Sequence, residues 1–166
     1  MRRLLIGLGV AAALIAAGPV SAEEAVVTYK SLAPDVALDL ARAALAQCRK
    51  DGFQVAVVVI DRFGQPLVVL RDRYAGLGAI STATGKAWTA VNFGRDTGEL
   101  IKSIRDGQLS AGLANLSNVV MLVGGLVIPS GGSIVGGVGV AGAPGGDKDE
   151  ACAKAGVAAI QDKLDF

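Results

Sequence analysis

Apolar positions in the first part of the chain predict one helix followed by two strands. From Pro34 to Lys50, alanines and leucines recur every three or four residues, the spacing that gathers them on one helix face. Gln54 to Asp61 reads QVAVVVID, a β-branched run typical of a strand covered on both faces. Turn residues follow and lead into Leu67 to Arg71, so we expect an antiparallel hairpin.

The middle of the chain predicts two helices and then a charge-free region of strands. The helices are Gly76 to Asn92 and Asp96 to Arg105, the second opening with Asp96 and Glu99 at capping-box spacing. No charged residue occurs between positions 107 and 146, but glycine and proline turns interrupt this stretch before it reaches about 20 apolar residues, the length of a membrane helix. We therefore expect three short buried strands: Asn118 to Val123, Leu126 to Pro129 and Ser133 to Ala141.

A last helix is predicted from Asp147, with Glu150 completing a second capping box. The predicted strands occur in adjacent runs and do not alternate strictly with helices. That order indicates an α+β fold with a mainly antiparallel sheet. No linker or internal repeat divides the chain, so we predict a single domain over residues 23–166.

Residues 1–22 have the pattern of a signal peptide. Arg2 and Arg3 precede an apolar stretch over residues 4–17, and Val20-Ser21-Ala22 offers the small residues of a cleavage site. A retained membrane anchor is the alternative, but the apolar stretch is short for a bilayer. We therefore expect a periplasmic or extracellular protein with no membrane span in its mature chain.

The charge balance argues against a nucleic-acid partner. The full chain carries a formal net charge of +1, and removal of Arg2 and Arg3 leaves 14 basic and 15 acidic residues. A protein that binds nucleic acid usually presents a strongly basic face. We expect a small-molecule ligand instead.

The chain contains no histidine, so triads that depend on a histidine base are excluded and the commonest zinc and haem ligand is missing. The two cysteines, Cys48 and Cys152, fall on predicted helices. In an exported protein a disulfide between them is expected, with two separately buried thiols as the alternative.

The string at positions 137–142, Gly-Val-Gly-Val-Ala-Gly, matches the G-x-G-x-x-G of dinucleotide sites. That site needs a β-α-β unit and an acidic residue about 20 positions on, and too little chain follows Gly142 to build them. Glycines in a strand also let a helix, a partner subunit or a flat ligand approach closely. The loop of residues 142–146, next to a predicted helix start, is a candidate anion cradle.

Few side chains suggest chemistry. Lys86 and Thr89 share a helix face, where Lys86 could contact a carboxylate or propionate; a solvated lysine is the alternative. Asp61 and Arg71 bracket the hairpin and either pair across it or leave Arg71 facing a ligand. Trp88 is interpreted as a core anchor. The candidate iron ligands besides cysteine are Met121, Tyr29 and Tyr74, each with a structural role as the alternative.

Several stretches together resemble the GlcG/HbpS-like haem-binding proteins, which are related to the C-terminal domain of the PduO corrinoid adenosyltransferases. They are VVVIDRFG at residues 57–64, KAWTA at residues 86–90, the Gly124-Gly125 pair and GGVGVAG at residues 136–142. The family's usual serine in the last stretch is Ala141 here, so a hydroxyl contact from that position is absent.

The resemblance implies a profilin-like fold with a five-stranded antiparallel sheet flanked by helices, assembly into multimers, and binding of haem or a related tetrapyrrole. The leading hypothesis is thus a secreted, non-enzymatic haem-binding protein without catalytic residues. An oligomeric interaction module for a sensor or neighbouring enzyme is the second hypothesis, and an enzyme acting on small organic acids the third. The ligand site is expected at these residues: Lys86, Thr89, Arg71, Gly124, Gly125 and Gly139.

Overall fold

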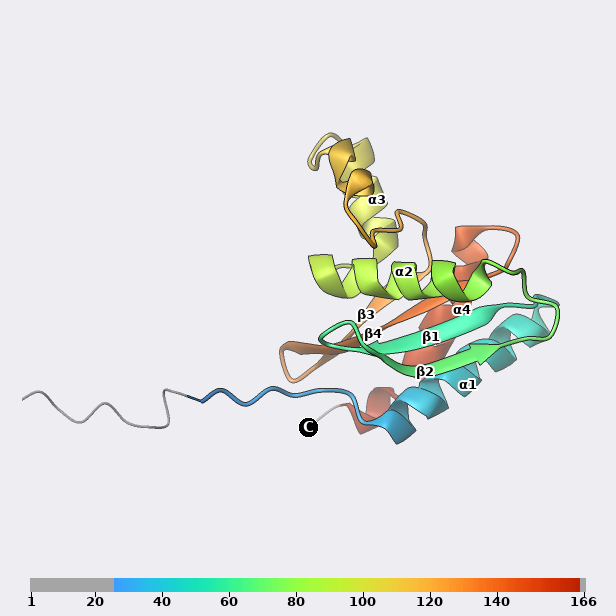
Figure 1. Cartoon of the computed structure of the whole chain (residues 1–166). Coiled ribbons are helices and arrows are strands. Elements are labelled where there is room, and N and C mark those ends of the chain that lie inside the picture. Colours follow the sequence, from blue (N-terminus) through green and yellow to red (C-terminus); the bar gives the residue numbers. More distant parts are fainter. Residues whose placement is uncertain (1–25, 165–166) are drawn as a thin grey trace, which may run out of the picture.

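The computed structural model describes residues 26–164, which contain four α-helices and a four-stranded antiparallel sheet (Figure 1). The strands lie in the order β2-β1-β4-β3. In chain order the elements are α1 (Pro34–Lys50), β1 (Ala56–Asp61), β2 (Pro66–Arg71), α2 (Ala79–Phe93), α3 (Thr97–Arg105), η2 (Ala111–Asn115), β3 (Gly125–Ser130), β4 (Ser133–Ala141), α4 (Gly146–Ala158) and η3 (Gln161–Lys163). The α+β class and the β1–β2 hairpin predicted from the sequence are confirmed.

Helices cover both faces of the sheet, as Figure 1 shows. Helix α2 packs on one face, whereas α1 and α4 pack together on the other. Side chains of β1 point alternately to the two faces of the sheet. Val57 and Val59 belong to the core beneath α1 and α4, whereas Val58 and Ile60 belong to the core beneath α2. This two-sided burial explains why the strand is apolar at nearly every position. Helix α3 and η2 project away from the layers.

The sheet register brings one end of several elements together. Ala56, the first residue of β1, lies opposite Arg71 of β2 on one side and Ala141 of β4 on the other. The C-terminal end of α1 leads into β1 at the same end of the sheet. The loops of residues 72–78 and 142–146 therefore leave the sheet side by side.

A disulfide joins the two helices on one face of the sheet. Cys48 of α1 and Cys152 of α4 are bonded, both are fully buried, and their Cα atoms are 5.5 Å apart. The predicted pairing is confirmed, and separate thiols are excluded. The bond closes a loop across most of the described chain, with a sequence separation of 104.

The glycines of β4 allow α2 to pack closely on the sheet. Gly137 and Gly139 point toward α2, and small residues of α2, including Ala83 and Ala87, meet them. A Cβ atom on Gly139 would overlap the Ala83 carbonyl oxygen and lie 2.8 Å from the Ala87 amide nitrogen. What approaches this glycine-rich strand is thus α2 itself, and the antiparallel sheet excludes a dinucleotide fold.

We expect Gly139→Ala to lower the free energy of unfolding by about 1–3 kcal/mol or more, because backbone atoms of α2 must move to admit a methyl group. Urea unfolding followed by circular dichroism measures the change. Gly76→Ala is the matched control, since a Cβ there meets nothing within 4 Å and should cost little. Equal stability of the two variants would contradict this packing.

The structure corrects the predicted fifth strand and both predicted capping boxes. Residues 118–123 form no strand; the Val120 amide donates to the Thr89 hydroxyl of α2, at 2.8 Å, rather than to a neighbouring strand. The five-stranded sheet implied by the resemblance is therefore a four-stranded sheet within residues 26–164. Asp96 accepts a hydrogen bond from the Val127 amide instead of capping α3, and α4 begins after Gly145 without a side-chain cap.

The predicted signal peptide, residues 1–22, lies outside the described residues. Within residues 26–164, no helix has the length and apolar character needed to cross a bilayer.

Candidate functional site

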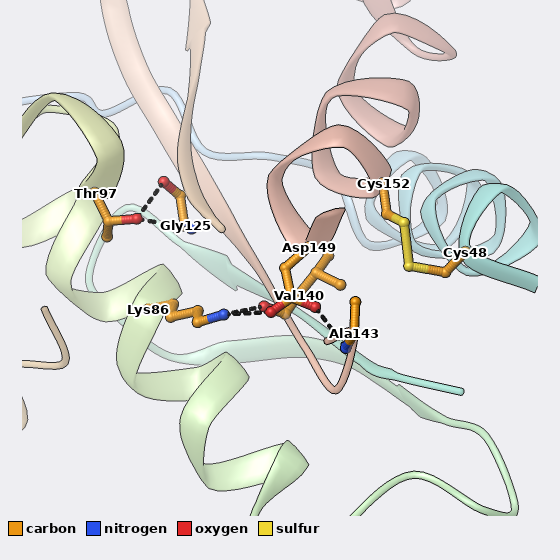
Figure 2. Close-up of polar contacts among 8 residues, drawn as sticks. All are labelled: Cys48, Lys86, Thr97, Gly125, Val140, Ala143, Asp149 and Cys152. Carbon is orange, nitrogen blue, oxygen red and sulfur yellow. Dashed lines mark hydrogen bonds and ion pairs between the residues drawn. A yellow bond between two sulfur atoms is a disulfide. The ribbon is translucent and has the colours of Figure 1, made fainter. Parts of the chain in front are cut away.

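A buried ion pair connects α2 with α4. Lys86 is only 2% exposed, and its ammonium donates to Asp149 Oδ2 at 2.7 Å and to the Val140 carbonyl oxygen at 2.8 Å (Figure 2). The alternative of a solvated lysine is therefore wrong. Helix α2 carries Lys86 toward the C-terminal end of β4, where the first turn of α4 supplies Asp149.

The Asp149 carboxylate has partners for both oxygens. Its Oδ1 accepts the Ala143 amide at 3.0 Å, so it also fixes the loop between β4 and α4 (Figure 2). Burial raises the pKa of Asp149, while the hydrogen bonds from Lys86 and Ala143 act in the opposite direction. A buried charge needs such partners, because desolvation costs several kcal/mol per ion.

Gly124 and Gly125 make room for this ion pair. Gly124 adopts φ +117°, and a Cβ there would lie 2.7 Å from Asp149 Cβ and 3.1 Å from Lys86 Nζ. A Cβ on Gly125 would overlap the Lys86 carbonyl oxygen. The Gly125 amide donates to Thr97 Oγ1 at 3.0 Å (Figure 2), which ties the start of β3 to the first residue of α3. The two glycines thus pack against Lys86 and Asp149 and leave the space that this ion pair needs.

The Thr89 hydroxyl makes two hydrogen bonds within the protein. It donates to the Gly85 carbonyl oxygen at 2.7 Å and accepts the Val120 amide at 2.8 Å. Val120 also covers Gly85, where a Cβ would overlap its side chain. Thr89 therefore holds the segment that leads to Met121 against α2.

Arg71 and Asp61 are not partners of the ion pair. Arg71 donates to the Ala75 carbonyl oxygen, whereas Asp61 accepts the amides of Phe63 and Gln65 at the other end of the hairpin. The predicted pairing of Asp61 with Arg71 is therefore wrong. Gly139 lies beneath α2.

An open cavity of about 560 Å³ adjoins the ion pair, within the range of about 300–1,000 Å³ typical of small-molecule sites. Four segments surround it: the start of α2, helix α3 through Ile101, residues 121–123, and the loop that enters α4. Most of the lining is apolar or backbone, and Lys86 and Asp149 contribute its buried polar groups. The lining residues are Gly76, Ala79, Thr82, Lys86, Ile101, Met121, Leu122, Val123, Ala141, Gly142, Ala143, Pro144, Gly145, Gly146, Asp147 and Asp149.

The N-terminal end of α4 borders the cavity through Gly145 and Gly146. The first amides of a helix lack intrahelical acceptors, and this end of the helix dipole favours a carboxylate. Lys86 is neutralised by Asp149, and the exposed Asp147 is paired with the exposed Lys148 at 3.4 Å, so neither pair leaves a net charge beside the cavity. Apolar contact, rather than net charge, is therefore the main attraction that the cavity offers.

Of the candidate iron ligands, Met121 lines this cavity. Tyr29 instead packs edge-on against Phe63 at another groove, and Tyr74 is exposed on the loop after β2. The cysteine sulfurs are consumed by the disulfide. Residues 26–164 contain no cluster of acidic or cysteine side chains that could hold a metal ion on its own.

Two features of the site escaped the sequence reasoning. Asp149, which lies between the two residues of the capping box predicted for the last helix, is the partner of Lys86, yet 63 positions separate them and no local pattern links them. Trp88, the predicted core anchor, is only half-buried; it packs against the core beneath α2 and borders shallow surface grooves.

The fold is that of a small α+β protein, and its sequence matches a known family. Residues 32–158 match the family model described as "Haem degrading protein HbpS-like". The chain belongs to the HbpS-like family, a haem-binding and haem-degrading family. No curated protein matches the sequence.

Solved structures support the same assignment. A crystal structure of HbpS is 38% identical, with a TM-score of 0.77 over 81% of this chain and 94% of that one. A double mutant of HbpS from Streptomyces reticuli gives the same identity and TM-score over 90% and 98%. A complex described as PduOC with haem is 30% identical, with a TM-score of 0.73 over 78% and 95%.

Proposed function

We propose that this protein binds haem, or a related tetrapyrrole, in the cavity between α2, residues 121–123 and the loop entering α4. The observation that carries the proposal is the cavity itself. It has about 560 Å³ of space, and its walls combine apolar side chains such as Ala79, Leu122 and Val123 with the charged side chains of Lys86, Asp147 and Asp149. A broad apolar macrocycle with two carboxylates matches that distribution.

The residues present fit such a group. Ala79, Leu122 and Val123 offer apolar contact to the macrocycle, and the first turn of α4 offers backbone amides to a propionate. Met121 is the side chain of the cavity best suited to ligate iron, since a thioether is an established axial ligand. Haem would supply the redox and spectroscopic properties of iron at this position.

Two surface leucines provide a matched test. Leu122 lines the cavity and is 53% exposed, whereas Leu116 is 52% exposed and does not line it. In a hemin titration, the wild type and Leu116→Asp should shift the Soret band alike. Leu122→Asp should weaken binding by about tenfold or more, because it replaces an apolar contact with a carboxylate near the propionates.

Two results would count against the proposal. The first is a free-hemin spectrum in the presence of micromolar wild-type protein. The second is an equal loss of affinity in both aspartate variants, which would place haem elsewhere or make the effect non-specific. Lys86→Ala is unsuitable here because it removes one partner of a buried ion pair and thus disturbs the fold.

We propose binding, rather than turnover, as the function. Asp149 is the buried carboxylate of the cavity and is already held by Lys86 and Ala143, so it is poorly placed to act as a free base. The family's name makes haem degradation the competing function. Loss of the Soret band in a peroxide-treated complex, faster than for free hemin, would favour degradation.

We further propose that the protein acts outside the cytoplasm after cleavage at residue 22, and that it forms a homo-oligomer. The projecting α3 and η2 (Figure 1) support assembly, because their residues border an apolar groove of about 370 Å³. The groove is lined by Phe93, Arg95, Leu100, Leu109 and Leu113. An interaction module is the alternative function, and a tight protein partner without haem binding would favour it.

A further inference from the structure

The loop between β2 and α2 exposes large apolar side chains at one end of the molecule. Leu77 is fully exposed, Tyr74 is 79% exposed, and Ile80 at the start of α2 is 38% exposed. Scattered apolar residues are normal on a surface, but three within seven positions form a patch. Together with Arg71 and Arg73 they make up what we term the Leu77 face.

Glycines on both sides keep Leu77 away from the body of the protein. Gly76 and Gly78 flank it, and a Cβ atom at either position would meet nothing within 4 Å. The leucine therefore projects from a stretch of chain with open space around it. It can insert into an apolar environment without moving the helices or the sheet.

Two cations accompany these apolar side chains. Arg71 is exposed and donates to the Ala75 carbonyl oxygen, and the exposed Arg73 lies 5.9 Å from the Tyr74 ring centroid. Neither arginine has an ion-pair partner within residues 26–164. Their charges are thus available to an external anion.

The carboxylate within the same loop does not offset these charges at the surface. Asp72 is 4% exposed and accepts a hydrogen bond from Arg49 Nε at 2.8 Å. Lys50, exposed at the end of α1, adds a cation at this end of the sheet, beside Asp51, which accepts a hydrogen bond from Gln47. The balance of exposed charge here is positive, although the whole chain is nearly neutral.

We propose that the Leu77 face docks on an anionic lipid surface. Apolar and aromatic side chains that insert at the headgroup boundary, with arginines beside them for lipid phosphates, are the chemistry of interfacial binding. A second copy meeting this face through a two-fold axis would set the same unpaired arginines against each other. Charge complementarity therefore favours an anionic membrane over self-association here.

The docking has a consequence for ligand transfer, which rests on the proposed haem function. Gly76 and Ala79, on either side of Leu77, line the haem cavity. A protein seated on the Leu77 face therefore holds one wall of that cavity against the lipid. An apolar ligand dissolved in the bilayer would enter without crossing water.

Lipid docking itself is tested without haem, so its failure is distinguishable from failure of haem binding. Protein starting at Glu23, which keeps every described element and excludes the apolar leader, is sedimented with vesicles of phosphatidylcholine alone or with about one third phosphatidylglycerol. We expect binding to the anionic vesicles, weakened by salt. Leu77→Asp and Arg73→Glu should each lower the partition coefficient by about tenfold.

Matched controls are Leu116→Asp and Arg105→Glu, both at exposed positions away from the Leu77 face; each should bind vesicles as the wild type does. Equal binding to neutral and anionic vesicles, or equal losses in all four variants, would overturn the proposal. So would light scattering that shows an oligomer dissociated by Leu77→Asp, together with no vesicle binding, because a second copy would then be the occupant.

Discussion

Lys86→Ala should lower the free energy of unfolding by about 3–5 kcal/mol, the cost of leaving one partner of a buried ion pair without the other. Asp149 is 3% exposed and would lose the ammonium 2.7 Å from its Oδ2. The Val140 carbonyl oxygen would lose the same donor. Urea unfolding of the variant and the wild type at neutral pH measures the difference.

Two further variants separate the buried charge from general damage. Lys154→Ala removes an exposed lysine that pairs with Glu150 four residues earlier, and it should cost no more than about 0.5 kcal/mol. The double variant Lys86→Met, Asp149→Leu removes both buried charges and should recover much of the stability lost by Lys86→Ala. A Lys86→Ala cost as small as that of Lys154→Ala would show that the pair is not buried as described.

Removal of the disulfide should have an effect of similar size. The bond between Cys48 and Cys152 spans 104 positions. In the chain-entropy model, closing a loop of that length lowers the conformational entropy of the unfolded chain, which stabilises the folded protein by about 4–5 kcal/mol. The double variant Cys48→Ala, Cys152→Ala should unfold at a correspondingly lower urea concentration. Its unfolding should not respond to reductant, whereas that of the wild type should.

Mass spectrometry of the non-reduced protein checks the bond independently of stability. A peptide that joins Cys48 to Cys152 is expected, and two alkylatable thiols in native protein would contradict it. If the bond is present yet reductant leaves the unfolding midpoint unchanged, the loop-entropy account of its contribution is wrong.

Local patterns in the sequence identified most of the fold because they arise from local physics. Helix α1 has the predicted bounds, Pro34–Lys50, and β4 has the predicted bounds, Ser133–Ala141. The strand predicted for residues 118–123 is absent, because apolar residues alone do not show whether a neighbouring strand is available to pair with them. The Val120 amide instead donates a hydrogen bond to the Thr89 hydroxyl of α2. Strand number depends on such tertiary contacts.

The site was less predictable because it depends on contacts between distant segments. The sequence singled out Lys86, but nothing in the local sequence around Asp149 identifies it as the partner 63 positions away. Likewise, the glycines at 124 and 125 were noticed as possible ligand contacts, whereas their tight surroundings show a packing role. The residue types and motifs indicated which residues matter for the site, whereas only the folded structure showed what each of them contacts.

We propose that haem occupies the cavity beside Lys86 and Asp149. The most direct test is a crystal structure of the hemin-loaded protein, with iron located by its anomalous scattering. Iron is expected inside the cavity, between α2 and the loop of residues 142–146, with Met121 as the nearest sulfur. Iron at another surface, such as the groove beside Tyr29 and Leu164, would contradict it.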